Sequence, residues 1–204
     1  LLLKDYELIL ITRNPTKYGA DKAENLRYVS WDDSLNIIMD EADAVIHLAG
    51  EPVIDGRWNE EVKKKIYDSR IHSARKLVQA MAASTNKPKV FISASASGYY
   101  GNSGINWRAE EDVPGDDFLA KVCVDWEKEA QAAKELGIRV VHPRIGIVLG
   151  HDGGALKNML TPFRLGLGGS IGPGTQFMSW IHLRDLTRAI IHLLEEDGIQ
   201  GSVN

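Results

Sequence analysis

Residues 89–95 read Lys-Val-Phe-Ile-Ser-Ala-Ser, a short run dominated by apolar and β-branched residues. Similar runs occupy 7–12, 27–31, 43–48 and 138–142. They are apolar almost throughout instead of alternating with polar residues, which is typical of parallel strands covered on both faces. Amphipathic stretches lie between the runs, as in repeated βαβ units. The sequence therefore predicts an α/β fold with a doubly wound parallel sheet, in which 7–12, 43–48, 89–95 and 138–142 are neighbouring core strands.

Three of the amphipathic stretches are predicted to be helices, over 59–83, 117–136 and 183–195. The first begins at Asn59, a good N-cap residue, and the second ends before a glycine that suits a helix C-terminus. Arg70 falls on the apolar stripe of the first helix. A charge on a buried face must find a partner or reach solvent. The residues of that stripe are Val62, Ile66, Ala74, Leu77 and Met81.

The composition excludes several classes of protein. The chain has 204 residues, of which 44% are hydrophobic, enough for one sizeable core. A net charge of −4 argues against a nucleic-acid partner, which would need a basic face. No apolar run approaches the ~20 residues of a membrane span. The single Cys123 excludes an internal disulfide, which fits a reducing, cytoplasmic location. The six histidines show no metal-ligand spacing, so no metal is expected.

Glycine-rich segments mark the flexible part of the chain, at 150–154 and 166–174. The second lacks the preceding strand and following helix of a nucleotide fingerprint, so we interpret it as a substrate-side loop. The chain opens without Met and closes on an apparent strand start. We therefore expect a fragment that lacks the first strand and the Gly-rich loop.

Arg13 follows the apolar run 7–12 and precedes Pro15, which stops the strand. In dinucleotide-binding sheets a carboxylate at this place accepts from the ribose 2′-OH of NAD, whereas an arginine pairs with the 2′-phosphate of NADP. Arg13 therefore indicates NADP(H). The alternative, a surface arginine in a turn, stays open on this segment alone.

Four later segments together resemble the extended short-chain dehydrogenases/reductases. Asp43 to Gly50 is similar to their fourth-strand signature, and Phe91 to Gly101 is similar to their serine-bearing fifth strand ending in Tyr-Gly. Pro143 to Gly150 resembles the segment after strand six, and Trp180 to Asp185 resembles a later turn and helix. With Arg-Trp-Asn at 57–59 and the segment 162–169, the best match is the epimerase-family branch described as nucleoside-diphosphate-sugar epimerases.

The resemblance implies a Rossmann-type domain over 1–150, a segment of a small C-terminal substrate lobe over 151–182, and a return to the core over 183–204. It also implies an NADP(H) site assembled from several strand ends. Thr12 and Arg13 would hold the 2′-phosphate. Leu48 and Ala49 would line the crevice after the fourth strand, and Val148 would sit beside the nicotinamide. The remaining implied cofactor residues are Lys65, Arg70, Ser95 and Arg144. Arg70 occupies a helix position that usually carries Asn in extended members, which also accounts for its place on an apolar stripe.

The chain departs from the family where proton transfer is expected. Members that move hydride use a Tyr and a Lys one helical turn apart, with a serine on strand five. Those two helix positions hold Leu119 and Cys123 here, and the usual serine position holds Ala96. Ser95 and Tyr100 remain as candidate catalytic residues. Lys121 lies about 200° around the helix from Leu119, so we expect it in solvent.

Three functions stay open from the sequence. The first is an NADP(H)-dependent oxidoreductase or epimerase-like enzyme acting on a small or nucleotide-linked substrate. The second is a catalytically inactive module that senses NADP(H). The third is a nucleoside-diphosphate-sugar epimerase, against which the missing Tyr and Lys weigh. A small-molecule substrate is expected in the first case, and a homodimer stays open.

Overall fold

The computed structural model describes residues 5–18, 23–53, 58–151, 153–170 and 172–204. Its main sheet has five strands: β3 (Ala44–His47), β4 (Val90–Ser93), β5 (Ser95–Ala96), β6 (Arg139–Ile145) and β9 (Gly201–Val203). All of their pairings are parallel, in the order β3-β4-β6-β5, with β9 also pairing with β6. This confirms the predicted Rossmann-type α/β architecture.

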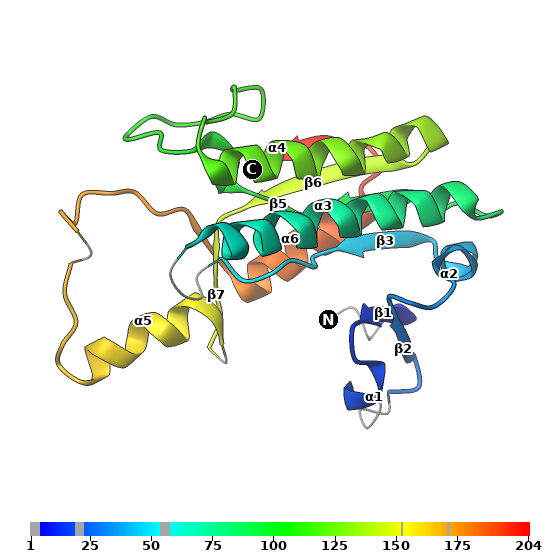
Figure 1. Cartoon of the computed structure of the whole chain (residues 1–204), viewed down its shortest axis with the longest axis horizontal. Coiled ribbons are helices and arrows are strands. Elements are labelled where there is room, and N and C mark those ends of the chain that lie inside the picture. The colour runs from blue at the N-terminus through cyan, green and yellow to red at the C-terminus, as the bar shows by residue number, and fades with distance from the viewer. Residues whose placement is uncertain (1–4, 19–22, 54–57, 152, 171) are drawn as a thin grey trace.

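Helices cover both faces of this sheet, as its apolar strands require. On one face lie α2 (Leu35–Glu41), α3 (Glu60–Ala83) and α4 (Phe118–Gln131), and on the other lies α6 (Leu183–Glu195) (Figure 1). Successive residues of β4 therefore enter different cores. Phe91 packs with the α3 side, whereas Val90 and Ile92 pack with Ile190 of α6. All four residues of β4 are buried.

The predicted strands at 7–12 and 27–31 form a pair of their own. They correspond to β1 (Leu8–Thr12) and β2 (Leu26–Ser30), which pair in parallel with each other and not with the main sheet among the described residues. The prediction that 7–12 neighbours the other core strands in the ladder is therefore wrong. Ile9 and Ile11 nevertheless pack against the core cluster under α2 and α3. Packing, instead of backbone hydrogen bonds, joins this pair to the main sheet. A short helix, α1 (Pro15–Tyr18), follows β1.

The predicted strand 89–95 is divided, and 138–142 is longer than expected. Ile92 lies opposite Val141, and Ser95 lies opposite Arg144, so Pro143 falls opposite Ala94. Ala94 is the residue that separates β4 from β5. Because proline has no N–H to donate, a break in the ladder at this point costs nothing. Pro143 is thus accommodated inside β6, where the sequence indicated a strand end.

The helices agree with the predicted ranges apart from one end. Asn59 accepts from Val62 N at 2.8 Å and caps α3, and Asp117 accepts from Ala120 N at 2.9 Å and caps α4. The helix predicted over 117–136 is α-helical only to Gln131, and a 3₁₀ turn over 132–136 follows it. This turn ends at Gly137, whose φ of 79° is left-handed. Another 3₁₀ turn, η2 (Ser97–Tyr100), follows β5 directly.

The segment 147–182 forms a smaller unit beside the sheet. Strand β7 (Ile147–Leu149) pairs in parallel with β8 (Trp180–His182), and helix α5 (Gly154–Arg164) lies between them in the chain. Figure 1 shows this unit projecting from one end of the main sheet. The assignment of 151–182 to a substrate lobe stays a prediction.

Candidate functional site

The first predicted cofactor residues stand at the end of β1. Thr12 is half-buried, and its hydroxyl accepts from Asn14 N at 3.4 Å. Arg13 is exposed, and no acidic partner of its side chain occurs among the described residues. Because no carboxylate of the described residues pairs with it, this planar guanidinium can bind a phosphate. The local geometry is therefore compatible with 2′-phosphate recognition.

A second group of predicted residues surrounds the end of β3. Leu48 and Ala49 are exposed directly after the buried His47. A Cβ at Gly50 would lie 2.8 Å from Arg70 Cζ, so a larger residue here would displace the guanidinium. Arg70 Nη1 donates to Glu51 O and Ile66 O, each at 3.0 Å, and its Cζ lies 5.4 Å from the ring centroid of Trp126.

Arg70 resolves the puzzle of a charge on an apolar stripe. It is half-buried between the backbone at Gly50 and the face of Trp126, where burial lowers the pKa of its guanidinium. Two backbone carbonyls and a cation–π contact stabilise it. Within the described chain it forms no ion pair, which leaves Nε and Nη2 for other acceptors.

Lys65 and Val148 lie in different surroundings. Lys65 is exposed on α3, and its Nζ donates to Glu61 Oε1 at 2.7 Å, an ordinary surface pair one helical turn away. Val148 belongs to β7 and pairs with Ile181 of β8. It is half-buried where the main sheet gives way to the smaller unit. A contact of either residue with a cofactor stays a prediction.

His47 is a buried residue of the site region that the motifs did not single out. Trp126 Nε1 donates to His47 Nδ1 at 3.3 Å, and His47 Nε2 lies 2.8 Å from Ser73 Oγ. Since Trp126 can only donate, Nδ1 is the acceptor and the ring proton is on Nε2. Burial, with a smaller effect of Arg70, lowers the pKa of His47 to about 4, so the ring is neutral. Its position at the end of an apolar strand was the available signal.

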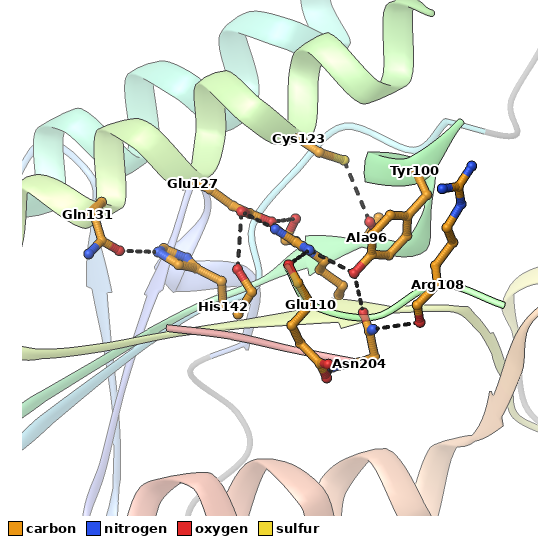
Figure 2. Close-up of polar contacts among 12 residues, drawn as sticks. Ala96, Tyr100, Arg108, Glu110, Cys123, Glu127, Gln131, His142 and Asn204 are labelled. Atoms are coloured by element: carbon orange, nitrogen blue, oxygen red, sulfur yellow. Dashed lines mark hydrogen bonds and ion pairs between the residues drawn. The ribbon is translucent and has the colours of Figure 1, made fainter. Parts of the chain in front are cut away.

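A buried ion pair occupies the carboxyl end of β6 (Figure 2). Arg144 Nε and Nη2 donate to the two carboxylate oxygens of Glu127 at 2.9 and 3.0 Å, and these side chains are only 3% and 12% exposed. Arg144 Nη1 also donates to Tyr100 Oη at 2.7 Å and Glu110 O at 2.9 Å. Burial alone would lower the pKa of Arg144, but the hydrogen bonds with Glu127 and Tyr100 outweigh it and raise the pKa.

This network changes how three of the predicted site residues are interpreted. Arg144 directs four of its five N–H groups to protein acceptors, so the geometry favours a supporting role over direct cofactor contact. Ser95 is buried, and its hydroxyl donates to Glu127 Oε1 at 2.6 Å. Tyr100 is also buried, and its hydroxyl donates to Asn204 Oδ1 at 2.8 Å. Neither hydroxyl has a proton left for a substrate in this arrangement.

The two helix positions that lack Tyr and Lys do face this region. Leu119 lies 3.6 Å from a Cβ built at Gly98 of η2, and Cys123 Sγ lies 3.9 Å from Ala96 O. Burial raises the pKa of Cys123 to about 11, so its thiol stays protonated. Lys121 is exposed and pairs with Asp125 at 3.0 Å, as expected. Apolar and neutral groups thus stand where a Tyr-Lys relay would be.

The described residues contain no cluster of three His, Cys, Asp or Glu side chains that could hold a metal ion. No helix in this part of the chain is long and apolar enough to cross a membrane.

Comparison with known proteins identifies the family. A model of the NAD dependent epimerase/dehydratase family matches residues 1–204. The chain belongs to this family. Epimerase family protein SDR39U1 from Bos taurus is 36% identical, and epimerase family protein YfhF from Bacillus subtilis is 35% identical. Each alignment covers 100% of this chain and 67% of the relative, so the chain spans about two thirds of their length.

Solved structures agree with this assignment. This epimerase/dehydratase-family chain superposes on human epimerase family protein SDR39U1, solved with NADPH, with a TM-score of 0.84 and 33% identity, covering 98% of this chain and 66% of that one. It matches a nucleoside-diphosphate sugar epimerase from Corynebacterium glutamicum with a TM-score of 0.76 and 31% identity, covering 98% and 46%. The resemblance inferred from the sequence motifs is therefore confirmed.

Proposed function

We propose that the protein binds NADP(H) and acts as an oxidoreductase or epimerase-like enzyme on a small or nucleotide-linked substrate. The observation that carries the proposal is Arg13, exposed at the end of β1 without a carboxylate partner in the described chain. The related human protein was solved with NADPH, which supports the choice of cofactor.

The residues at the strand ends fit a dinucleotide. Thr12 and Arg13 would hold the 2′-phosphate, and the exposed Leu48 and Ala49 would lie along the crevice at the carboxyl end of β3, where dinucleotides bind in such sheets. Arg70 would direct its remaining N–H groups to an anionic oxygen near Gly50. When bound, NADP(H) supplies or accepts a hydride. The chain's own contribution is to bind, orient and shield the reacting groups.

The proposal is tested by measuring cofactor affinity. Replacing Arg13 by Ala is expected to weaken NADPH binding by about 1–3 kcal/mol, because it removes a charged hydrogen-bonding fork. Affinity for NADH should be unchanged, since NADH has no 2′-phosphate. Titration calorimetry on the wild type and the variant with both cofactors measures this difference.

Arg27→Ala is the matched control. Arg27 is an exposed arginine on the neighbouring strand, where it pairs with Glu41 at 2.6 Å, and its removal should alter neither affinity. Equal affinity of the wild type for NADPH and NADH would contradict the NADP(H) assignment.

A second function is favoured by a specific observation. Leu119 and Cys123 face η2 and β5 where the family's proton relay would stand, so a module that senses NADP(H) without turnover is a competing proposal. NADPH oxidation across a panel of carbonyl compounds separates the two. Tight NADPH binding without oxidation of any compound would favour the sensor.

Three further proposals accompany this one. Nucleoside-diphosphate-sugar epimerisation stays a third candidate, supported by the 31% identical epimerase from Corynebacterium glutamicum and weakened by the absent Tyr and Lys. We also propose that the protein is cytoplasmic and that it forms a homodimer.

A further inference from the structure

Three serines alternate along the chain where β4 passes into η2, at positions 93, 95 and 97. We propose that Ser97, and not Ser95, supplies the hydroxyl that donates a hydrogen bond to the substrate oxygen. This inference rests on the proposed function and deepens it. The ligand group that it implies is an oxygen that accepts a hydrogen bond, such as that of the carbonyl compounds on which the proposed oxidoreductase would act.

The contacts of Ser93 and Ser95 exclude them as hydrogen-bond donors to the substrate. Ser93 is completely buried, and its Oγ lies 3.5 Å from His47 Nδ1 inside the core. Ser95 is 3% exposed and lies 2.6 Å from a Glu127 oxygen that also receives Arg144. An ionised carboxylate can only accept, so the single proton of Ser95 points at Glu127. Neither serine can donate to a ligand without breaking a buried contact.

Ser97 differs in exposure and in the kind of group that it contacts. It is half-buried at the start of η2. Its Oγ lies 2.9 Å from Ser179 Oγ, and in a pair of hydroxyls either one can donate. When Ser179 donates, the proton of Ser97 is left for a ligand, because no carboxylate holds it among the described residues. A hydroxyl that accepts one hydrogen bond becomes a better donor in the next, because the chain of bonds is polarised.

The hydroxyl pair lies where the main sheet meets the smaller unit. Ala96, the residue before Ser97, pairs with Ile145, the residue before Gly146. A Cβ at Gly146 would lie 2.8 Å from Ser179 O, so glycine is needed for this close approach. Ile147 N donates to Ser179 O at 2.9 Å, and Val148, the predicted nicotinamide neighbour, comes next. A carbonyl bound here would meet Ser97 near the predicted hydride position.

The test compares serine variants of the full-length protein with NADPH. A panel of carbonyl compounds is screened, and kcat/KM is measured with the compound turned over fastest. Ser97→Ala should lower kcat/KM by roughly 10²-fold, the usual effect of losing one preorganised donor. NADPH affinity should be unchanged, and Ser97→Thr, which keeps a hydroxyl, should recover most of the activity. Ser179→Ala should give a smaller loss.

The control is Ser103→Ala, which removes a half-buried hydroxyl that accepts from Arg108 Nε at 3.0 Å. Its kcat/KM should match the wild type. If Ser97→Ala stays within twofold of the wild type while Ser95→Ala loses activity at unchanged NADPH affinity, the inference is overturned and Ser95 is the donor.

A wild type that oxidises NADPH with no compound would contradict the proposed enzymatic function and leave the placement of the donor to be decided by structure. Crystals of the NADPH complex soaked with hydroxyacetone answer that question. A carbonyl oxygen within hydrogen-bond distance of Ser97 Oγ supports the inference. Binding at Ser95, or no binding beside Ser97, overturns it.

Discussion

At the scale of single residues, the buried ring of His47 connects two helices of the candidate site. Its two nitrogens join Trp126 of α4 to Ser73 of α3, and Trp126 in turn carries the guanidinium of Arg70. Protonation would set an N–H of His47 against the indole N–H of Trp126 and bring a second charge near Arg70. The neutral ring is therefore part of the packing that positions Arg70.

This environment predicts a loss of stability in acid. The pKa of His47 falls from 6.5 to about 4 on folding, so the unfolded chain binds the proton more tightly. The free energy of unfolding should therefore be highest above pH 6.5. It should decrease as the pH falls towards 4, by at most about 3 kcal/mol. Urea unfolding at pH 7.5 and 4.5 measures the decline. His142, whose pKa burial also lowers, adds to it in the same direction.

Substitution isolates the share of His47. His47→Gln keeps an acceptor for Trp126 and a donor for Ser73 without titrating, so this variant should lose less stability between the two pH values than the wild type. His192→Gln, at an exposed histidine of α6, should behave like the wild type. An identical acid loss in His47→Gln and the wild type would show that His47 does not carry the effect.

At the scale of elements, the Arg144–Glu127 pair connects β6 to α4, and its hydrogen bonds reach β5, η2 and β9. Glu127→Gln should lower the free energy of unfolding by about 3–5 kcal/mol, because it leaves the Arg144 charge buried without its counter-ion. Chemical denaturation at pH 7.5 measures this loss.

The same helix provides the matched control. Glu129 pairs with Arg75 of α3 at 2.6 Å, but these side chains are 26% and 50% exposed. Glu129→Gln should therefore cost no more than about 1 kcal/mol. Similar losses in the two variants would mean that burial does not distinguish the pairs.

The elements also show what the sequence could predict. Continuous apolar runs identified β3, β4 and β6, because strands covered on both faces require that pattern. The short strand β5 was merged with β4, and of β9 only an apparent start was recognised. Pro143 misled the reading of β6, since the sequence does not show that the neighbouring strand breaks opposite it. The motifs located the segments of the candidate site. They did not show that the donors of Ser95, Tyr100 and Arg144 are used internally, because Glu127 lies in another segment and only the fold brings it to them.

At the scale of the whole molecule, stability is distributed unevenly. The main sheet is buried between two cores, and every residue of β4 is buried. In contrast, β1 and β2 contain no fully buried residue and pair only with each other in the described chain. Figure 1 shows this pair beside the body of the sheet. The residues proposed to bind the 2′-phosphate thus stand on the less protected unit.

Hydrogen exchange should reveal this division. Amides of β4 and β6 are expected to exchange only through global unfolding, whereas those of β1 and β2 should exchange faster through local opening, because fewer buried contacts hold them. Saturating NADPH should slow exchange in β1 and β2, since a ligand bound through Arg13 stabilises the closed state. NADH at the same concentration should slow exchange in β1 and β2 less than NADPH does. Exchange in β1 as slow as in β4 without cofactor would contradict the division, and unchanged exchange with NADPH would argue against binding at Arg13.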